Sequence, residues 1–165
     1  MYIEQISVFI ENRTGRLADF TQVLADEGID IKGICVTDTV DYGILRCICN
    51  DPEKATRALN ERGFTASVTK VLGIEIQDVP GGLNKVMQLL RERNISLDYI
   101  YSINKISDKT AGLIIKVGDP AEAARVLREA GVGLYDDETL RAEPVKEEKV
   151  FAGKLRDILN ESDSF

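Results

Sequence analysis

The sequence predicts an α+β fold in which one β-α-β-β-α-β unit occurs twice in tandem. The first observation is a repeated turn: residues 12–17 read NRTGRL, and residues 78–83, which lie 66 positions later, read DVPGGL. The second is that each turn stands between a run of alternating apolar residues and a helical pattern of apolar residues. The repeated element is therefore a strand, a glycine-containing turn and the start of a helix.

The first strand of each unit is indicated by a period of two. Apolar residues occupy every second position of 6–10 in the first unit and of 72–76 in the second. This alternation is typical of a strand that packs one face against a hydrophobic core.

The first helix of each unit follows the glycine turn. Gly28 and Asn94 stand where a residue in the left-handed conformation usually ends a helix. The apolar residues recur with helical spacing, and the two sets are Leu17, Phe20, Val23 and Leu24 in the first unit and Leu83, Val86, Leu89 and Leu90 in the second.

The second half of each unit is a hairpin, a helix and a closing strand. Asp51-Pro52 and Asp119-Pro120 predict the helix starts, because aspartate caps a helix and proline suits its first position. The expected strands are 29–37, 44–49 and 65–71 in the first unit and 95–103, 113–117 and 133–140 in the second, with polar hairpin turns at 38–42 and 107–110.

This order is the split β-α-β arrangement of a ferredoxin-like fold, an antiparallel sheet with both helices on one face. We expect the two units at residues 1–70 and 71–140, followed by a charged linker and a short amphipathic helix in residues 141–165. Units of roughly 70 residues are near the lower size limit for an independent core, so they should pack on each other or on a second chain. The candidates to supply apolar contacts on the uncovered face and edges are Phe9, Ile34, Val36 and Ile100.

Composition excludes several classes of function. The net charge of −7 disfavours nucleic acid as a partner. No apolar stretch approaches the ~18 residues that span a bilayer, so we expect a cytoplasmic protein with no signal peptide and no membrane partner. The chain contains no histidine, which removes the commonest general base and metal ligand. We therefore expect no catalytic residue, no metal site and no cofactor.

Three local patterns have two interpretations each. Cys47 and Cys49 could bind a metal, but the second unit has aliphatic residues at both positions, which favours packing. Tyr99 and Tyr101 share one face of a strand and either close over a ligand or fill space, with packing slightly favoured. The acidic run at 136–138 could attract a divalent cation, but a solvated strand end is the favoured interpretation.

A unit of this length with Asn-Arg-x-Gly-x-Leu after its first strand resembles the ACT domain, a regulatory module that binds amino acids. Residues 10–17 (IENRTGRL) are especially similar to the corresponding segment in the serine-sensing domain of D-3-phosphoglycerate dehydrogenase. The resemblance covers residues 1 to about 140 as two tandem copies, with no catalytic domain attached.

The resemblance also implies where a ligand binds. In ACT domains the amino acid typically lies between two units, bound by the first turn of one unit and the start of the second strand of its neighbour. Asp78 departs from the family's frequent asparagine, and Thr14 from a frequent proline. By position, the implied ligand-binding residues are Asn12, Arg13, Thr14, Gly15, Arg16, Leu17 and Asp30, together with Asp78, Val79, Pro80, Gly81, Gly82, Leu83 and Ser96.

The chemistry of the two turns suits a zwitterion. Backbone N–H groups at a helix start stabilise a carboxylate, and the side chain of Asn12 or Asp78 can accept hydrogen bonds from an ammonium group. An ionised Asp78 also repels a carboxylate placed close to it, so the Asn12 turn is the favoured site. Two simpler interpretations stay open: a strand-to-helix turn often needs glycine without any ligand, and Arg13 is either a carboxylate ligand or merely solvated.

The leading hypothesis is a non-enzymatic regulator that binds a free amino acid at the interfaces of units within a homodimer. The alternative is an assembly or interaction protein that acts as a regulatory partner of a metabolic enzyme without binding a ligand. An enzyme on the same scaffold, such as a small phosphatase, is least favoured because no nucleophile is paired with a base.

Overall fold

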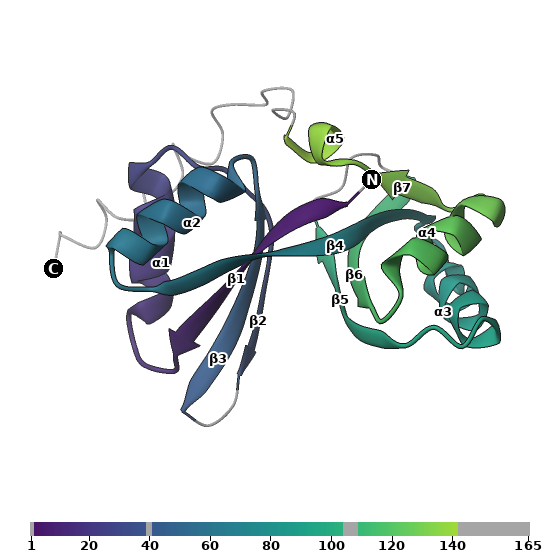
Figure 1. Ribbon diagram of the computed structural model, residues 1–165, viewed down its shortest axis with the longest axis horizontal. Helices are drawn as coiled ribbons and strands as arrows, with labels where there is room; N and C mark the ends of the chain where they lie inside the picture. The colour runs from purple at the N-terminus through teal and green to yellow at the C-terminus, as the bar shows by residue number, and fades with distance from the viewer. Residues whose placement is uncertain (1, 39–40, 104–108, 142–165) are drawn as a thin grey trace, which may run out of the picture.

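The computed structural model describes residues 2–38, 41–103 and 109–141. The chain forms a continuous antiparallel sheet with helices on its outer sides (Figure 1). In chain order the elements are β1 (Ile3–Glu11), α1 (Arg16–Asp26), β2 (Ile31–Asp38), β3 (Tyr42–Cys49), α2 (Pro52–Glu61), β4 (Thr65–Gln77), α3 (Gly82–Glu92), β5 (Leu97–Ile103), β6 (Thr110–Val117), α4 (Pro120–Glu129), β7 (Gly133–Tyr135) and α5 (Asp137–Arg141).

Strand β4 belongs to both units. Its first half pairs with β1, where Val71 lies opposite Ile3, and its second half pairs with β6, where Leu72 lies opposite Ile115. The strand order is β2-β3-β1-β4-β6-β5, and β7 also pairs with β4. Each unit therefore has the ferredoxin-like order, as predicted, but the expected strands 65–71 and 72–76 are one continuous strand.

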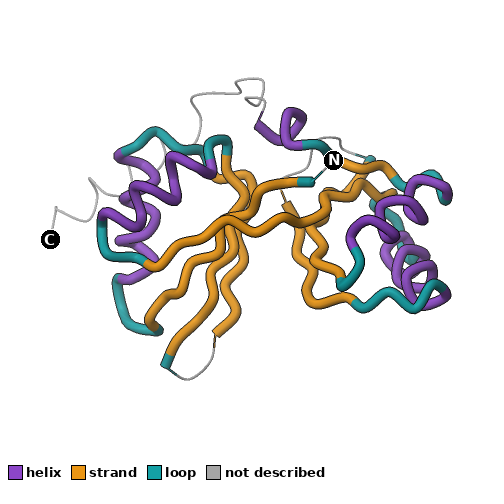
Figure 2. Tube along the Cα trace, in the orientation of Figure 1, coloured by secondary structure: helices purple, strands orange, loops and turns teal. Residues whose placement is uncertain are grey.

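Helices α1 and α2 lie on one outer side and α3 and α4 on the other, with the strands between the two pairs (Figure 2). Helices α1 and α2 cover one side of the first unit's sheet, and α3 and α4 cover one side of the second unit's sheet. The first core contains Val8, Phe20 and Leu59, and the second contains Ile74 and Leu127. As predicted, Asp51 and Asp119 cap α2 and α4 through their side chains.

The uncovered faces of the two sheets pack against each other. A third cluster of buried residues joins Ile48 of β3 to Ile103 and Ile114 of β5 and β6. The approach is close, because a Cβ added at Gly33 of β2 would lie 2.6 Å from Cγ2 of Ile103. The faces that needed cover are therefore covered largely within one chain.

The end of the second unit differs from the expected strand at 133–140. Strand β7 stops at Tyr135, and α5 follows. The reason is a local cap: Oδ1 of Asp136 accepts hydrogen bonds from the N–H (2.8 Å) and the hydroxyl (2.6 Å) of Thr139. The acidic run therefore starts a helix rather than ending a strand. The linker and amphipathic helix expected after this point lie, from residue 142 on, outside the described residues, as do parts of both hairpin turns.

Some apolar residues occupy faces other than those expected. Leu17 and Leu83 lie on helix faces that stay exposed, although Phe20 and Val86 are buried as predicted. Ile34 and Val36 were candidates for apolar contacts on the uncovered face and edges of the sheet. A register shift between Ile31 and Gly33 places them on the helix side of β2, which is an edge strand, and not on the uncovered face. Ile100 of β5 likewise packs on the helix-side core of its unit, whereas Phe9 lies on the opposite face and is exposed.

Candidate functional site

The two strand-to-helix turns have the same backbone geometry. Gly15 and Gly81 each precede the first helical residue and have φ angles of 87° and 85°. Each turn is hydrogen-bonded to the neighbouring hairpin. The N–H of Asn12 donates to the carbonyl of Asp41 (3.0 Å), and the N–H of Asp78 donates to the carbonyl of Lys109 (3.1 Å). A positive φ at the last residue before the helix explains why glycine stands there in both units.

The helix starts offer backbone donors. Within the described residues, the N–H groups of Thr14, Gly15, Leu17 and Ala18 donate to no other group, and those of Gly81, Leu83 and Asn84 behave likewise in the second unit. Such N–H groups, together with the helix dipole, make a helix start attractive to an anion. Both turns therefore have the backbone chemistry expected of carboxylate binding.

A cavity of about 150 Å³ lies beside the first turn. Three predicted site residues line it: Asn12, Arg13 and Leu17. The other lining residues are Ile10, Glu11, Val36 and Gly43. These four were not predicted, because their position depends on the register of β1, β2 and β3, which the sequence pattern does not give.

The two arginines of the first turn have partners within the chain. Nε of Arg13 lies 2.6 Å from Oε2 of Glu11, and both side chains are exposed. The guanidinium carbon of Arg16 lies 3.7 Å from the ring centroid of Phe64. Arg16 therefore packs on the body of the first unit and does not line the cavity, whereas Arg13 does.

The second turn differs from the first at four positions, which are occupied by Asp78, Val79, Pro80 and Gly82. Pro80 has no N–H, so this turn has one donor fewer than the turn with Thr14. Val79 is exposed. Gly82 is buried, and a Cβ there would lie 2.3 Å from the carbonyl oxygen of Gln77. The two turns are thus alike in backbone but not in surroundings.

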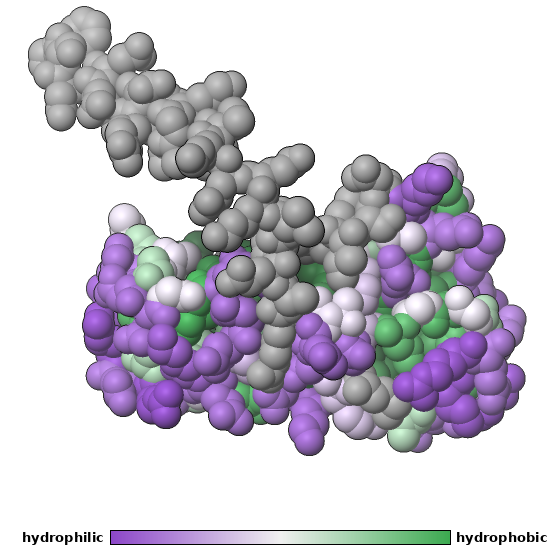
Figure 3. Space-filling model, turned by 90° about the horizontal axis from the view of Figure 1, so that it is seen from above, coloured by the Kyte–Doolittle hydropathy of each residue, from purple (hydrophilic) through white to green (hydrophobic). Residues whose placement is uncertain are grey.

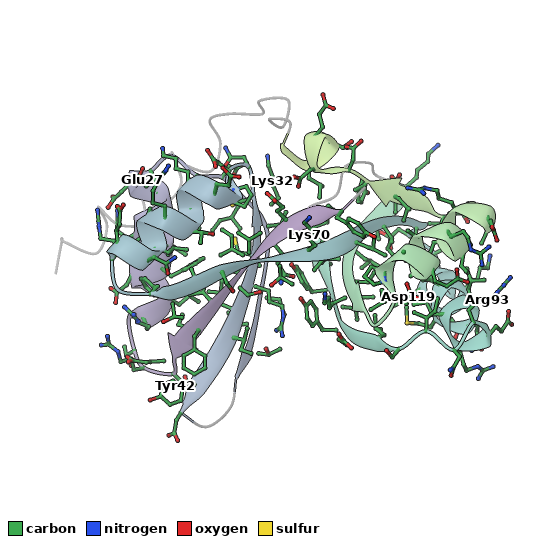
Figure 4. All side chains as sticks on the ribbon, in the orientation of Figure 1. Glu27, Lys32, Tyr42, Lys70, Arg93 and Asp119 are labelled. Atoms are coloured by element: carbon green, nitrogen blue, oxygen red, sulfur yellow. The ribbon has the colours of Figure 1, made fainter. Side chains whose placement is uncertain are left out.

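Asp30 and Ser96 lie at the far ends of the sheets from the turns of their own units. The N–H of Asp30 donates to Oδ1 of Asn50, just beyond β3, whereas the Asn12 turn bonds to the residue before β3. The eight residues of β3 separate these points by roughly 25 Å. In Figure 4, Lys32 and Tyr42 mark the two ends. Ser96 similarly accepts from Gly118 after β6, and the Asp78 turn bonds to Lys109 before it.

The remaining candidates are structural. Cys47 and Cys49 are 0% and 3% exposed in the first core, and the hydrogen bond with Cys49, together with burial, raises the pKa of the Cys47 thiol. In the described part of the chain, no group of three or more metal-ligating side chains is found. Tyr99 and Tyr101 both hydrogen-bond to Gln5, so they pack between the two sheets, which is the interpretation that the sequence slightly favoured.

Comparison with known proteins defines the family. The family model of the ACT domain pair matches residues 1–142. The chain therefore belongs to the ACT domain pair family, which confirms the resemblance in the sequence. A comparison with curated protein sequences gave no match.

Solved structures have the same fold. Protein BT0572 from Bacteroides thetaiotaomicron is 36% identical, with a TM-score of 0.81, over 87% of this chain and 98% of that one. The regulatory subunit of aspartate kinase from Thermus thermophilus is 21% identical, with a TM-score of 0.58, over 77% of this chain and 91% of that one. The second likeness shows the shared fold only.

Among residues 2–38, 41–103 and 109–141, no helix combines the length and the apolar composition of a membrane span. Seen from above, hydrophilic side chains cover much of the surface, and hydrophobic ones show in smaller areas on its left-hand and right-hand parts (Figure 3).

Proposed function

We propose that this chain is a non-enzymatic regulatory protein that binds a free amino acid at the Asn12 turn, in a site completed by a second copy. The observation that supports it is a half-formed site. Asn12, Arg13 and Leu17, the last with an unpaired backbone N–H, line a cavity of about 150 Å³. Ligand pockets usually measure roughly 300–1,000 Å³, so one wall is missing.

The donors and acceptors of this turn match a zwitterion. The N–H groups of Leu17 and Ala18 and the helix dipole stabilise a carboxylate. The amide oxygen of Asn12 accepts from an ammonium group. Arg13 remains able to donate to the carboxylate as well, because Glu11 contacts only its Nε in the ion pair.

The missing wall fits a second copy added along β2. In the described residues β2 pairs only with β3, so its outer edge has no strand neighbour. Beside this edge Leu17, Ile34 and Val36 are 46%, 40% and 44% exposed. Burying them against a copy removes apolar surface from water.

A two-fold axis beside β2 also explains the position of Asp30. Antiparallel pairing of two copies of β2 carries the start of one strand to the end of the other. Asp30 of the second copy then lies beside the Asn12 turn, although the two residues are at opposite ends of one unit. The homodimer thus brings together residues that the single chain keeps apart.

The Asp78 turn is the weaker site in this proposal. Pro80 removes a donor, and the negative Asp78 side chain opposes a carboxylate. The edge strand β5 also carries the exposed polar Ser102 where β2 carries Val36. A second copy therefore gains less apolar burial there.

In this proposal the bound ligand closes the dimer. A metabolic enzyme binds the closed form of the dimer and is regulated by this binding. A ligand that contacts two copies at once stabilises the dimer in proportion to its differential affinity. No catalytic role is assigned to the chain, because it lacks histidine and its buried thiols are packed in the core.

The test is calorimetric titration of the twenty common amino acids into wild type, Asn12→Ala and Asp78→Ala. We expect at least one amino acid to bind wild type. Asn12→Ala should weaken it by about 10- to 100-fold, the value of a hydrogen bond to a charged group, while Asp78→Ala leaves it nearly unchanged. A stable dimer that binds none of them would instead support the alternative, an assembly protein without a ligand.

A further inference from the structure

The cavity beside the Asn12 turn has a glycine on its floor. Gly43 is the second residue of β3 and lies opposite Ile10 of β1, and both residues line the cavity. Residues directly opposite each other in an antiparallel pair share one face of the sheet. Ile10 is buried in the helix-side core, so a side chain at position 43 would point to the same side. Glycine therefore leaves space on the helix side of the sheet at this point.

The side chains around this floor are aliphatic. Val36 of β2 lies opposite Leu45, which is buried in the helix-side core, so Val36 also faces the helix side. Leu17 comes from the first turn of α1. Ile10, Leu17 and Val36 thus approach the space beside Gly43 from two strands and one helix, and all three line the cavity.

The charged residues of the lining lie toward the turn. Glu11 follows Ile10 on β1, so its side chain points to the opposite face of the sheet. The carboxylate of Glu11 holds the guanidinium of Arg13 through a 2.6 Å ion pair. Tyr42, which lies opposite Glu11, marks this end of the sheet in Figure 4. The cavity therefore has a polar part at the turn and an aliphatic part on the helix side.

The second unit has other residues at the equivalent positions. Ala111 of β6 lies opposite Ile76, in the register that Gly43 has in the first unit, and Ser102 of β5 takes the place of Val36. A methyl group thus stands on the floor and a hydroxyl in the wall. Because alanine fits this position of the strand in one unit, the strand geometry does not explain the glycine in the other.

We propose that the floor at Gly43 sets the specificity of the Asn12 site, and that the ligand is an aliphatic amino acid larger than alanine. This inference rests on the function proposed above. With the carboxylate at the start of α1 and the ammonium group at Asn12, the side chain of the ligand lies over Gly43 and packs on Val36 and Leu17. A hydroxyl or a charge on the ligand would lose its water against these aliphatic groups, which is unfavourable.

The first test is calorimetric titration of wild type with valine, leucine, isoleucine and methionine, and with alanine, serine and aspartate for comparison. We expect at least one of the first four to bind about tenfold or more tightly than each of the other three. The reason is that one methylene group in an apolar pocket changes affinity about 10-fold or more.

Two variants then change the floor and the wall. Gly43→Ala, which installs the residue of the second unit, should lower the preference for the aliphatic ligand over alanine about tenfold by filling the floor. Val36→Thr should lower it by placing a hydroxyl against the ligand. Ile34→Thr is the matched control, because Ile34 lies on the same face of β2 and is similarly exposed, at 40% against 44%. The preference is a ratio of two affinities in one variant, so a change in dimer formation cancels.

The outcomes separate this inference from the function on which it rests. Tighter binding of serine or aspartate than of any aliphatic amino acid, lost in Asn12→Ala, would support the Asn12 site and overturn the aliphatic specificity. An aliphatic preference that Val36→Thr leaves unchanged, or that Ile34→Thr lowers equally, would overturn the role of this floor and wall. Failure of every amino acid to bind would overturn both proposals. Val36 is exposed, so its variant decides the question if Gly43→Ala does not fold.

Discussion

The hydroxyl of Tyr101 donates a 2.8 Å hydrogen bond to Oε1 of Gln5, across the interface between the two sheets. Nε2 of the same glutamine donates to the hydroxyl of Tyr99 and to Oγ of Ser7, both at 3.0 Å. Gln5 is fully buried. The packing of the two units therefore includes a polar contact that only one relative position of the sheets satisfies.

Replacing Gln5 by leucine should destabilise the chain. The change leaves the hydroxyls of Tyr99 and Tyr101 without this partner in a buried place, which costs about 1–3 kcal/mol. Urea denaturation measures the free energy of unfolding. Gln22→Leu is the control, because Gln22 is exposed on α1 and bonds only to Asp26. Equal losses from the two variants would show that the inter-sheet contact contributes nothing specific.

The dimer proposal predicts different effects at two equivalent positions. Val36→Asp places a charge in the proposed interface along β2, which should dissociate the dimer because an unpaired charge is costly to bury. Ser102→Asp, at the equivalent position of β5, should leave the mass unchanged. Sedimentation equilibrium measures both. A dimer that survives Val36→Asp would place the second copy elsewhere.

The phenol groups of Tyr135 and Tyr101 should ionise at a higher pH than an exposed tyrosine does. Burial, with a smaller effect of the nearby Glu75 carboxylate, raises the pKa of Tyr135 to about 12, and burial also raises the pKa of Tyr101. Because the folded state favours the neutral phenol, this contribution to stability is complete below the unfolded pKa of about 10. It is lost as the pH rises toward 12.

Spectrophotometric titration of tyrosinate tests this expectation. Tyr135→Phe should remove one component that titrates near pH 12, whereas Tyr42→Phe should leave that component in place. Persistence of the component in Tyr135→Phe would mean that another tyrosine is responsible for it.

Sequence patterns predicted the features that depend on neighbours along the chain. The two glycine turns, the caps at Asp51 and Asp119 and the alternation of the strands are local, and each is present in the structure. Residues 65–71 and 72–76 were expected as two strands, although no turn-forming residue was required between Val71 and Leu72. The single strand β4 that they form was therefore missed. The start of α5 was missed because the cap at Asp136 looked like a polar strand end.

The candidate site was predictable only in part. Asn12, Arg13 and Leu17 belong to one motif, so they were found together. Val36 joins them because the register shift in β2 places it on the helix side, which alternation alone does not reveal.

In the dimer that we propose, one amino acid is held by the Asn12 turn of one copy and the β2 start of the other. Mixed dimers of Asn12→Ala and Asp30→Ala test this shared site, through calorimetric titration of the co-expressed variants with the amino acid that binds wild type. Each variant alone should bind the amino acid at least about tenfold more weakly than wild type does. Random mixing makes half of the dimers mixed, and each mixed dimer has one intact site and one site that lacks both side chains. About a quarter of all sites should therefore regain wild-type affinity. No recovery in the mixture would contradict a site shared between copies.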